Sequence, residues 1–276
     1  MIHYSDFWNL DRPPFDAGPD PDFFFESRAH GEALARLLYF STDRAMGLAA
    51  ITGEIGAGKT MTLQVLVHRL PPDVYRVITV YTAPESPAGM LAEINRLLGG
   101  AEAGAPGESA DALRREFHRL LNQRITASGR HLLIVIDEAQ LMSDTCLDTV
   151  KCLTNPVETG NSHVSVVLSG QPELKVRLRA VPQVQQRMGL LYHLGYLSRE
   201  EVPAYVRHRL AVARSGSLDL FDAEGLDLLY RFSGGCPRQI NRVCKLAVDR
   251  ACMLRKTAVD VGMVEMIVND FGKQFS

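Results

Sequence analysis

A glycine-rich segment at residues 53–60 has the residue types and the spacing of an anion-binding loop. Its sequence, GEIGAGKT, matches the pattern G-x-x-x-x-G-K-[ST], in which glycines let backbone N–H groups curl around phosphate oxygens. A helix that begins at the end of the loop would add the positive end of its dipole. We therefore expect a nucleotide-phosphate site formed by Gly53, Gly56, Ala57, Gly58, Lys59, Thr60 and Met61.

Two side chains at the end of this loop can act on the phosphates directly. Lys59 carries a point charge that suits the β- and γ-phosphates, and the hydroxyl of Thr60 can join the ligand shell of a magnesium ion. The alternative interpretation is a chance glycine-rich turn. The sequence favours the phosphate site, because an apolar run precedes the loop and a helical pattern follows it.

An apolar run at 131–136, HLLIVI, leads directly into two acids, Asp137 and Glu138. A strand that ends in a carboxylate is the usual second half of such a site, and Asp137 would hold the magnesium ion, usually through water. Glu138 is placed to polarise an attacking water, which favours hydrolysis over simple binding. The alternative is that Glu138 caps the helix that follows.

The next apolar run, HVSVVLS, covers residues 163–169, and polar side chains stand at its end. Because the carboxyl ends of parallel strands meet at one edge of a sheet, a polar side chain here would lie beside the γ-phosphate. Our first candidate is Gln171 and the second is Ser169; an ordinary loop turn remains the other interpretation.

The elements that must position these groups alternate along the chain. The pattern predicts strands at 48–52, 75–81, 131–136, 163–169 and 190–194, with amphipathic helices between them, and therefore an α/β fold with a parallel sheet covered on both faces. After Gly216 only helical patterns follow. The predicted domains are an N-terminal arm and first helix (1–45), a P-loop nucleotide-binding domain (46–215) and an all-helical lid (216–276).

Composition excludes several classes of protein. The chain has 276 residues and a formal net charge of −2, so it can bury a large core without disulfides and is a poor candidate for bulk coating of nucleic acid. The five cysteines form no C-x-x-C pair, and no cationic leader or apolar run of roughly 18 to 20 residues occurs. We expect a cytoplasmic protein without a transmembrane segment; a zinc site at Cys236 and Cys244 is the less favoured alternative.

The ordered set of motifs resembles the AAA+ ATPases of the ExeA/GspA type, which are related to the transposon ATPases TnsC, TniB and MuB. The resemblance rests on GEIGAGKT together with RPPF (12–15), PDPDFFF (19–25), IDEAQ (136–140), SGQPEL (169–174), QQR (185–187), YHL (192–194), YVRHRL (205–210) and GCPRQIN (235–241). It implies an AAA+ fold with a five-stranded parallel sheet and a helical lid, with ATP and Mg²⁺ as cofactors. It also implies assembly of the chain with copies of itself when nucleotide is bound.

The resemblance implies roles for two arginines. Arg187 resembles the arginine finger that reaches a neighbour's nucleotide, although Arg177 and Arg179 compete for that role, and the segment 180–184 lacks an arginine-rich stretch that some relatives have. Arg238 resembles the sensor-2 arginine of the lid. The acidic N-terminal arm would help to enclose the adenine. Larger members carry a membrane helix and a peptidoglycan-binding domain after the ATPase core; this chain has neither, so we do not expect cell-wall attachment.

Charge is unevenly distributed, with an acidic arm and two basic segments, at 173–214 and 231–256. The basic segments indicate a DNA surface, a subunit interface or solvated helix faces. The first function we expect is that of an ATP-hydrolysing oligomer that acts as a motor or switch in the assembly of a secretion or cell-envelope machine. The alternative is an adaptor that binds duplex DNA and recruits or regulates a transposase. The third is an interaction scaffold whose nucleotide is structural.

Overall fold

The computed structural model describes residues 4–43, 46–99, 109–154, 163–214 and 219–274. The chain forms two compact units. The first comprises Met1–Gly31, Gly56–Met61 and Gly195–Ser276, and the second comprises Glu32–Ile55 and Thr62–Leu194. The boundaries predicted at residues 45 and 215 touch segments outside the described residues, and the predicted division into three domains stays a prediction.

The second unit is built on a five-stranded sheet. Its strands are β1 (Leu48–Gly53), β2 (Tyr75–Val80), β3 (His131–Ile136), β4 (Val164–Gly170) and β5 (Met188–Leu194). They lie in the order β2-β3-β4-β1-β5, and every neighbouring pair is parallel. The predicted parallel sheet is thereby confirmed. Since Ile136 pairs with Leu168 and Thr52 with Gly170, the carboxyl ends of β3, β4 and β1 share one edge.

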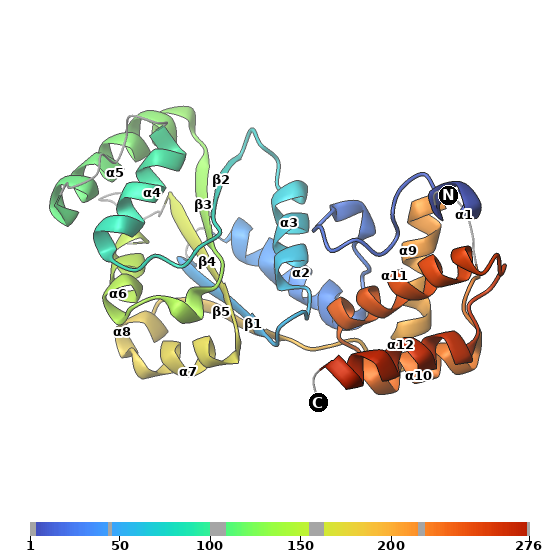
Figure 1. The fold of residues 1–276 in the computed structure, drawn as a ribbon. Coiled ribbons are helices and arrows are strands. Elements are labelled where there is room, and N and C mark those ends of the chain that lie inside the picture. The colour runs from blue at the N-terminus through green and yellow to red at the C-terminus, as the bar shows by residue number, and fades with distance from the viewer. Residues whose placement is uncertain (1–3, 44–45, 100–108, 155–162, 215–218, 275–276) are drawn as a thin grey trace. The chain divides into compact units, whose positions relative to one another are not determined.

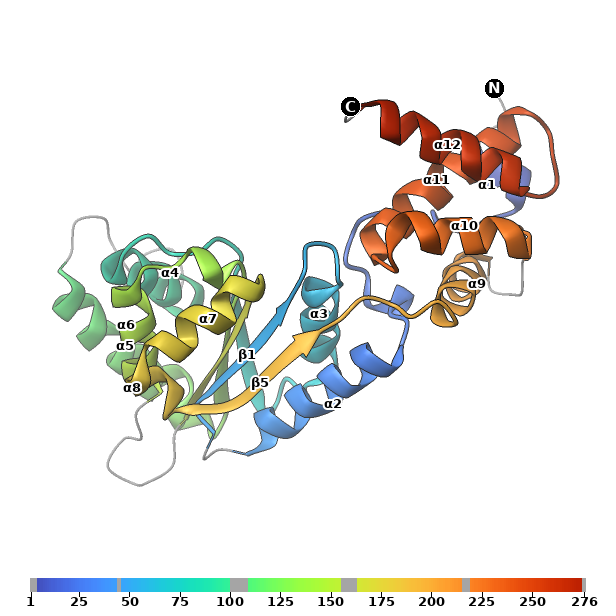
Figure 2. The ribbon, with the colours of Figure 1, turned by 90° about the horizontal axis from the view of Figure 1, so that it is seen from below.

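Apolar side chains on both faces of β1, β3 and β4 are buried, which is the pattern of a sheet covered on both sides. One face carries Ala50, Ile134 and Val166 and joins a large apolar core. Helices α4 to α8 lie on one side of the sheet and helices α2 and α3 on the other (Figures 1 and 2). The helices are α2 (Arg28–Thr42), α3 (Lys59–Arg69), α4 (Pro87–Gly99), α5 (Ala110–Arg124), α6 (Asp144–Leu153), α7 (Pro172–Ala180) and α8 (Pro182–Gln185), with short 3-10 turns η2 (Thr126–Ser128) and η3 (Ala139–Leu141).

The first unit is helical. It contains α1 (Tyr4–Trp8), the 3-10 turn η1 (Pro21–Phe23), α9 (Glu201–Arg214), α10 (Ala223–Ser233), α11 (Pro237–Met253) and α12 (Val261–Gln274). Trp8, Phe15 and Phe23 of the arm are buried in the same apolar core as Val206 and Val243. The aromatic residues of the arm are therefore part of this unit's core.

Helix α9 begins at Glu201, and the Glu201 carboxylate accepts the backbone N–H of Ser198. The N-terminal arm is helical over Tyr4–Trp8. Within the described ranges, no helix combines the length and the apolar character needed to cross a membrane.

Candidate functional site

The glycine-rich loop leaves the carboxyl end of β1 and enters α3 at Lys59. Gly56 and Gly58 have φ values of 81° and 98°, a region that L side chains rarely adopt. A Cβ at Gly56 would lie 2.8 Å from Cβ of Arg238 and from Sγ of Cys236. The loop therefore needs glycine for its backbone conformation and for close packing, and Lys59 and Thr60 follow in the first turn of α3, where the helix dipole is positive.

Arg238, the second residue of α11, lies against this loop within the first unit. Its backbone N–H donates to the carbonyl oxygen of Gly56 over 3.4 Å, and its Cδ would lie 3.5 Å from a Cβ at Gly56. The residue itself is exposed. Pro237 begins the helix and removes one N–H that would otherwise lack an intrahelical partner. The structure thus brings the residue predicted from GCPRQIN next to the loop predicted from GEIGAGKT.

Asp137, directly after β3, is 7% exposed and belongs to the second unit. Its Oδ1 accepts the backbone N–H of Glu138 over 2.9 Å and the hydroxyl of Ser169 over 2.7 Å. Ser169 is fully buried in β4. Of our two candidates after the fourth strand, Ser169 is the one whose side chain contacts the acidic pair.

Glu138 is exposed and has a φ of 52°, the left-handed conformation, which costs a side-chain-bearing residue about 1–2 kcal/mol. The interpretation of Glu138 as a helix cap is wrong. Its side chain makes no capping hydrogen bond to η3, and α6 is capped by Ser143. Strain of this kind is tolerated mainly where the surrounding structure holds a residue in place for function.

Gln140 is a residue of the candidate site that our sequence reasoning missed. Its Nε2 donates to Oε2 of Glu138 over 2.7 Å, and its Oε1 accepts the backbone N–H of Gln171 over 3.0 Å. Gln140 therefore connects the exposed carboxylate to the loop after β4. The position of Gln140, two residues after Glu138 in IDEAQ, could have indicated the contact with Glu138. Nothing in that spacing indicated the contact with Gln171.

The three arginine-finger candidates differ in their surroundings. Arg177 donates to the carbonyl oxygen of Gln140 over 2.8 Å and to Asp144 over 2.6 Å. Arg179 and Arg187 are exposed, and Arg187 lies between α8 and β5. Arg177 is thus engaged within its own chain, whereas Arg187 presents its side chain to solvent.

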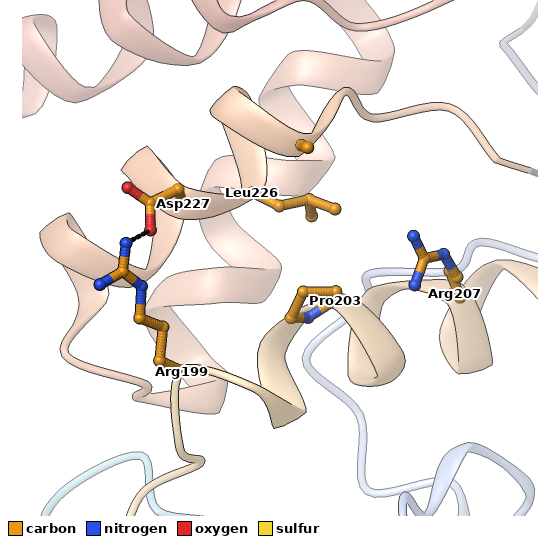
Figure 3. A pocket seen from close by; sticks show the side chains of 6 residues that line it. Arg199, Pro203, Arg207, Leu226 and Asp227 are labelled. Carbon is orange, nitrogen blue, oxygen red and sulfur yellow. Dashed lines mark ion pairs between the residues drawn. The ribbon is translucent and has the colours of Figure 1, made fainter.

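Acids offset much of the positive charge of the helical unit. A pocket between α9 and α10 has the apolar residues Pro203 and Leu226 between two arginines, Arg199 and Arg207 (Figure 3). Arg199 forms an ion pair with Asp227, which is drawn in the figure, and Arg207 pairs with Asp219. Lys245 likewise pairs with Asp16, and Lys256 with Asp260. Each of these pairs reduces the positive charge that the helical unit offers to a polyanion.

The described part of the chain holds no cluster of three His, Cys, Asp or Glu side chains that could bind a metal ion. Cys236 and Cys244, the zinc alternative, are both buried and neither is in a disulfide, and burial raises the pKa of Cys244. Oxygen donors of the kind that Mg²⁺ prefers are present in the Thr60 hydroxyl and the Asp137 carboxylate.

Comparison with known protein families and sequences identifies the relatives of this chain. A family model described as AAA domain matches residues 43–178. General secretion pathway protein A of Aeromonas hydrophila is 35% identical over 253 residues, which are 90% of this chain and 45% of that protein. The chain thus spans less than half the length of this curated relative.

Solved structures with the same fold are more distant in sequence. The ORC2 protein of Aeropyrum pernix, in its ADPNP-ADP complexes, aligns over 94% of this chain and 72% of its own, with a TM-score of 0.72 and 21% identity. Cdc6p of Pyrobaculum aerophilum aligns over 91% and 68%, with a TM-score of 0.71 and 16% identity. RuvB of Thermotoga maritima, a Holliday junction branch migration motor, aligns over 88% and 68%, with a TM-score of 0.57 and 14% identity. Because these identities are low, the similarity of this chain to the three structures shows a shared fold.

Proposed function

Because the chain belongs to the AAA-type P-loop ATPases related to General secretion pathway protein A, we propose that it binds ATP with Mg²⁺ and hydrolyses ATP to ADP and phosphate. The observation that carries the proposal is the loop 53–60. Two of its glycines have left-handed backbones, it runs into the N-terminus of α3, and it packs against Arg238. This combination suits a bound polyphosphate better than an ordinary turn.

The proposed binding roles follow from side-chain chemistry. Gly53, Gly56, Ala57 and Gly58 present backbone to the phosphates, Met61 continues the first turn of α3, and Lys59 adds a point charge. Arg238 supplies a guanidinium group, which remains charged and matches phosphate geometry. The Thr60 hydroxyl and the Asp137 carboxylate would hold Mg²⁺, which when bound neutralises charge on the β- and γ-phosphates.

Glu138 is the proposed general base. Its exposed carboxylate accepts a proton as water attacks the γ-phosphate, and Gln140 orients it by the hydrogen bond to Oε2. Gln171 and Ser169 remain the two candidates for a residue that senses the γ-phosphate; the contact with Asp137 favours a role for Ser169 through that carboxylate.

Lys59→Ala and Glu138→Gln test this proposal. Lys59→Ala should abolish nucleotide binding, because the compact charge at the phosphates is lost. Glu138→Gln should bind ATP while hydrolysing it at least about a hundredfold more slowly. A Lys59→Ala protein that still hydrolyses ATP at the wild-type rate would contradict the assignment of the site.

We extend the proposal to assembly and partners. Exposed Arg187 is proposed to act in a neighbouring copy of the chain, so that ATP drives homo-oligomer formation. The named relative favours a role in assembly of a secretion or cell-envelope machine, and we propose a cytoplasmic location for it. Because the chain spans only 45% of that relative, this role is proposed for the ATPase part alone.

The second candidate, a DNA-binding adaptor of a transposase, is favoured by the exposed Arg179 and Arg187 in the second unit. The ion pairs of the helical unit count against it. Measurement of ATP hydrolysis with and without duplex DNA, at two salt concentrations, distinguishes the secretion role from the DNA-binding role. Stimulation that falls with salt supports DNA binding, because phosphate contacts release counterions. No stimulation, with no retention of Glu138→Gln protein on DNA in ATP, supports the secretion role.

A further inference from the structure

A buried histidine connects the N-terminal arm to the phosphate loop within the first unit. Nε2 of His30 lies 2.8 Å from the carbonyl oxygen of Ala57, and the His30 side chain is 5% exposed. A carbonyl oxygen only accepts hydrogen bonds, so Nε2 must carry the proton. His30 therefore donates to the backbone of the loop, across 27 residues of sequence.

The arm accommodates the tautomer of His30 that the carbonyl oxygen of Ala57 requires. Nδ1 of His30 lies 2.7 Å from Oγ of Ser27 and, being unprotonated, accepts from that hydroxyl. Burial lowers the pKa of His30 more strongly than its other contacts raise it, so the neutral ring is favoured. The ring of Phe24 packs edge-on against it, at 6.2 Å between centroids. The proton on Nε2 thus faces the carbonyl oxygen of Ala57, and the arm's Ser27 hydroxyl satisfies the other ring nitrogen.

Direct packing reinforces this hydrogen bond. A Cβ at Gly58 would lie 2.8 Å from Nε2 of His30, so the ring lies close against the loop backbone at this point. In a trans peptide the C=O and the following N–H point in opposite directions. Holding the carbonyl of Ala57 toward His30 therefore aims the N–H of Gly58 away from the arm.

The turn that carries His30 is itself anchored. Glu201 accepts the backbone N–H of Arg28 over 2.9 Å through Oε1, and the N–H of Ser198 over 2.9 Å through Oε2. One carboxylate therefore ties the first turn of α2 to the start of α9. The turn that precedes His30 is thereby anchored to a second element of the same unit.

We infer that His30 is a positioning residue that aims the N–H of Gly58 at the bound phosphates, and that the arm thereby sets the nucleotide affinity of the loop. This inference rests on the proposed nucleotide-binding function. It assigns the arm a role at the phosphates, through hydrogen bonds between Ser27, His30 and Ala57.

The test compares three variants of the full chain. His30→Leu removes the donor and keeps an apolar side chain, whereas His30→Gln keeps an N–H donor at similar reach. Tyr205→Phe is the matched control, because it removes a partly buried hydrogen bond of the same unit, from the Tyr205 hydroxyl to Asn241 over 2.8 Å. Affinity for ATP and ADP is measured by displacement of a fluorescent nucleotide, and KM, kcat and the midpoint of thermal unfolding are measured alongside.

We expect His30→Leu to weaken ATP and ADP binding about tenfold, the scale of one well-placed hydrogen bond. KM should rise similarly with kcat within about twofold, since the contact acts on ground state and transition state alike. His30→Gln should restore most of the affinity. Tyr205→Phe should lower the unfolding midpoint without changing nucleotide affinity.

The inference is overturned if His30→Leu binds both nucleotides as tightly as the wild type, or if His30→Gln is as weak as His30→Leu. If His30→Leu does not fold, Ser27→Ala decides: an affinity unchanged relative to Tyr205→Phe overturns the inference, and a loss supports it. Failure of the proposed function is distinct, since the wild-type protein would then bind no nucleotide and Lys59→Ala would change nothing.

Discussion

The hydroxyl of Ser169 donates a 2.7 Å hydrogen bond to Oδ1 of Asp137, at the adjoining ends of β4 and β3. Both side chains are buried, so the carboxylate is oriented by a donor that solvent does not replace. An orienting partner of this kind matters for a metal-binding carboxylate as well as for folding.

Ser169→Ala should therefore raise the Mg²⁺ concentration needed for half-maximal ATP hydrolysis about tenfold, because Asp137 loses a buried donor. Titration of the ATPase rate with Mg²⁺ measures the effect. Gln171→Ala is the control, since the backbone N–H that binds Gln140 remains. If Gln171→Ala shifts the Mg²⁺ requirement as much as Ser169→Ala does, the assignment of this role to Ser169 rather than Gln171 is wrong.

Replacement of Gln140 should separate catalysis from binding. In Gln140→Ala the carboxylate of Glu138 loses its 2.7 Å donor, and we expect kcat to fall about tenfold with KM for ATP unchanged. Steady-state kinetics checks both values. If kcat/KM instead falls about tenfold because KM rises while kcat is unchanged, Gln140 acts on nucleotide binding.

The backbone of Glu138 predicts an unusual order of stabilities. Glu138→Gly and Glu138→Ala both remove the carboxylate, but only glycine relieves the left-handed conformation at φ 52°. We expect Glu138→Gly to have a free energy of unfolding about 1 kcal/mol higher than Glu138→Ala. Urea denaturation of the two inactive proteins provides the comparison. The opposite order would mean that the segment relaxes when the side chain is shortened.

Complementation between inactive proteins tests the trans role of Arg187. Arg187→Ala should hydrolyse ATP about a thousandfold more slowly, the lower end of the effect of an arginine finger. When it is mixed with Glu138→Gln, activity should return, because each protein supplies the group that the other lacks. Arg177→Ala, whose arginine contacts Asp144 and Gln140 of its own chain, serves as the comparison and should not be rescued. Rescue of Arg177→Ala alone would reassign the finger.

Acid should destabilise the helical unit through two histidines. Burial lowers the pKa of His30 despite the nearby carboxylate of Glu201, and burial together with Arg209 lowers the pKa of His208. Each unfolded histidine binds its proton at a higher pH than the folded one. The contribution of these neutral histidines to the free energy of unfolding is therefore complete above the ordinary pKa of 6.5. It is lost as the pH falls from there through the folded pKa.

Free energies of unfolding between about pH 7 and pH 5 should show this loss, and His30→Gln should reduce the slope. The substitution keeps a donor to Ala57 but cannot titrate. An unchanged slope in that variant would assign the acid sensitivity to other groups of the unit.

Much of the architecture could be predicted because its signals are local. Apolar runs placed the five strands, and the segments GEIGAGKT and IDEAQ located the glycine-rich loop and the acidic pair of the candidate site directly. Lys59, Asp137 and Glu138 were identified because a short motif carries both the chemistry and the strand or helix that presents it.

The contacts that orient these groups could not be predicted in the same way. Ser169 and Gln171 both lie near the end of the same strand, and only the three-dimensional arrangement showed that the Ser169 hydroxyl reaches Asp137 and that Gln140 receives the N–H of Gln171. The bond from His30 to Ala57 joins segments 27 residues apart, and the arm's aromatic residues are buried beside helices near the other end of the chain.

The sequence by itself determined the class of fold and located the glycine-rich loop and the pair of acids, because hydrophobic periodicity and glycine spacing act over a few residues. The tertiary structure decided which polar groups meet: His30 with Ala57, Ser169 with Asp137, and Gln140 with Glu138. The physical reason is that a hydrogen bond depends on positions within a few tenths of an ångström. Such positions follow from the packing of whole elements, and no local pattern of residues records them.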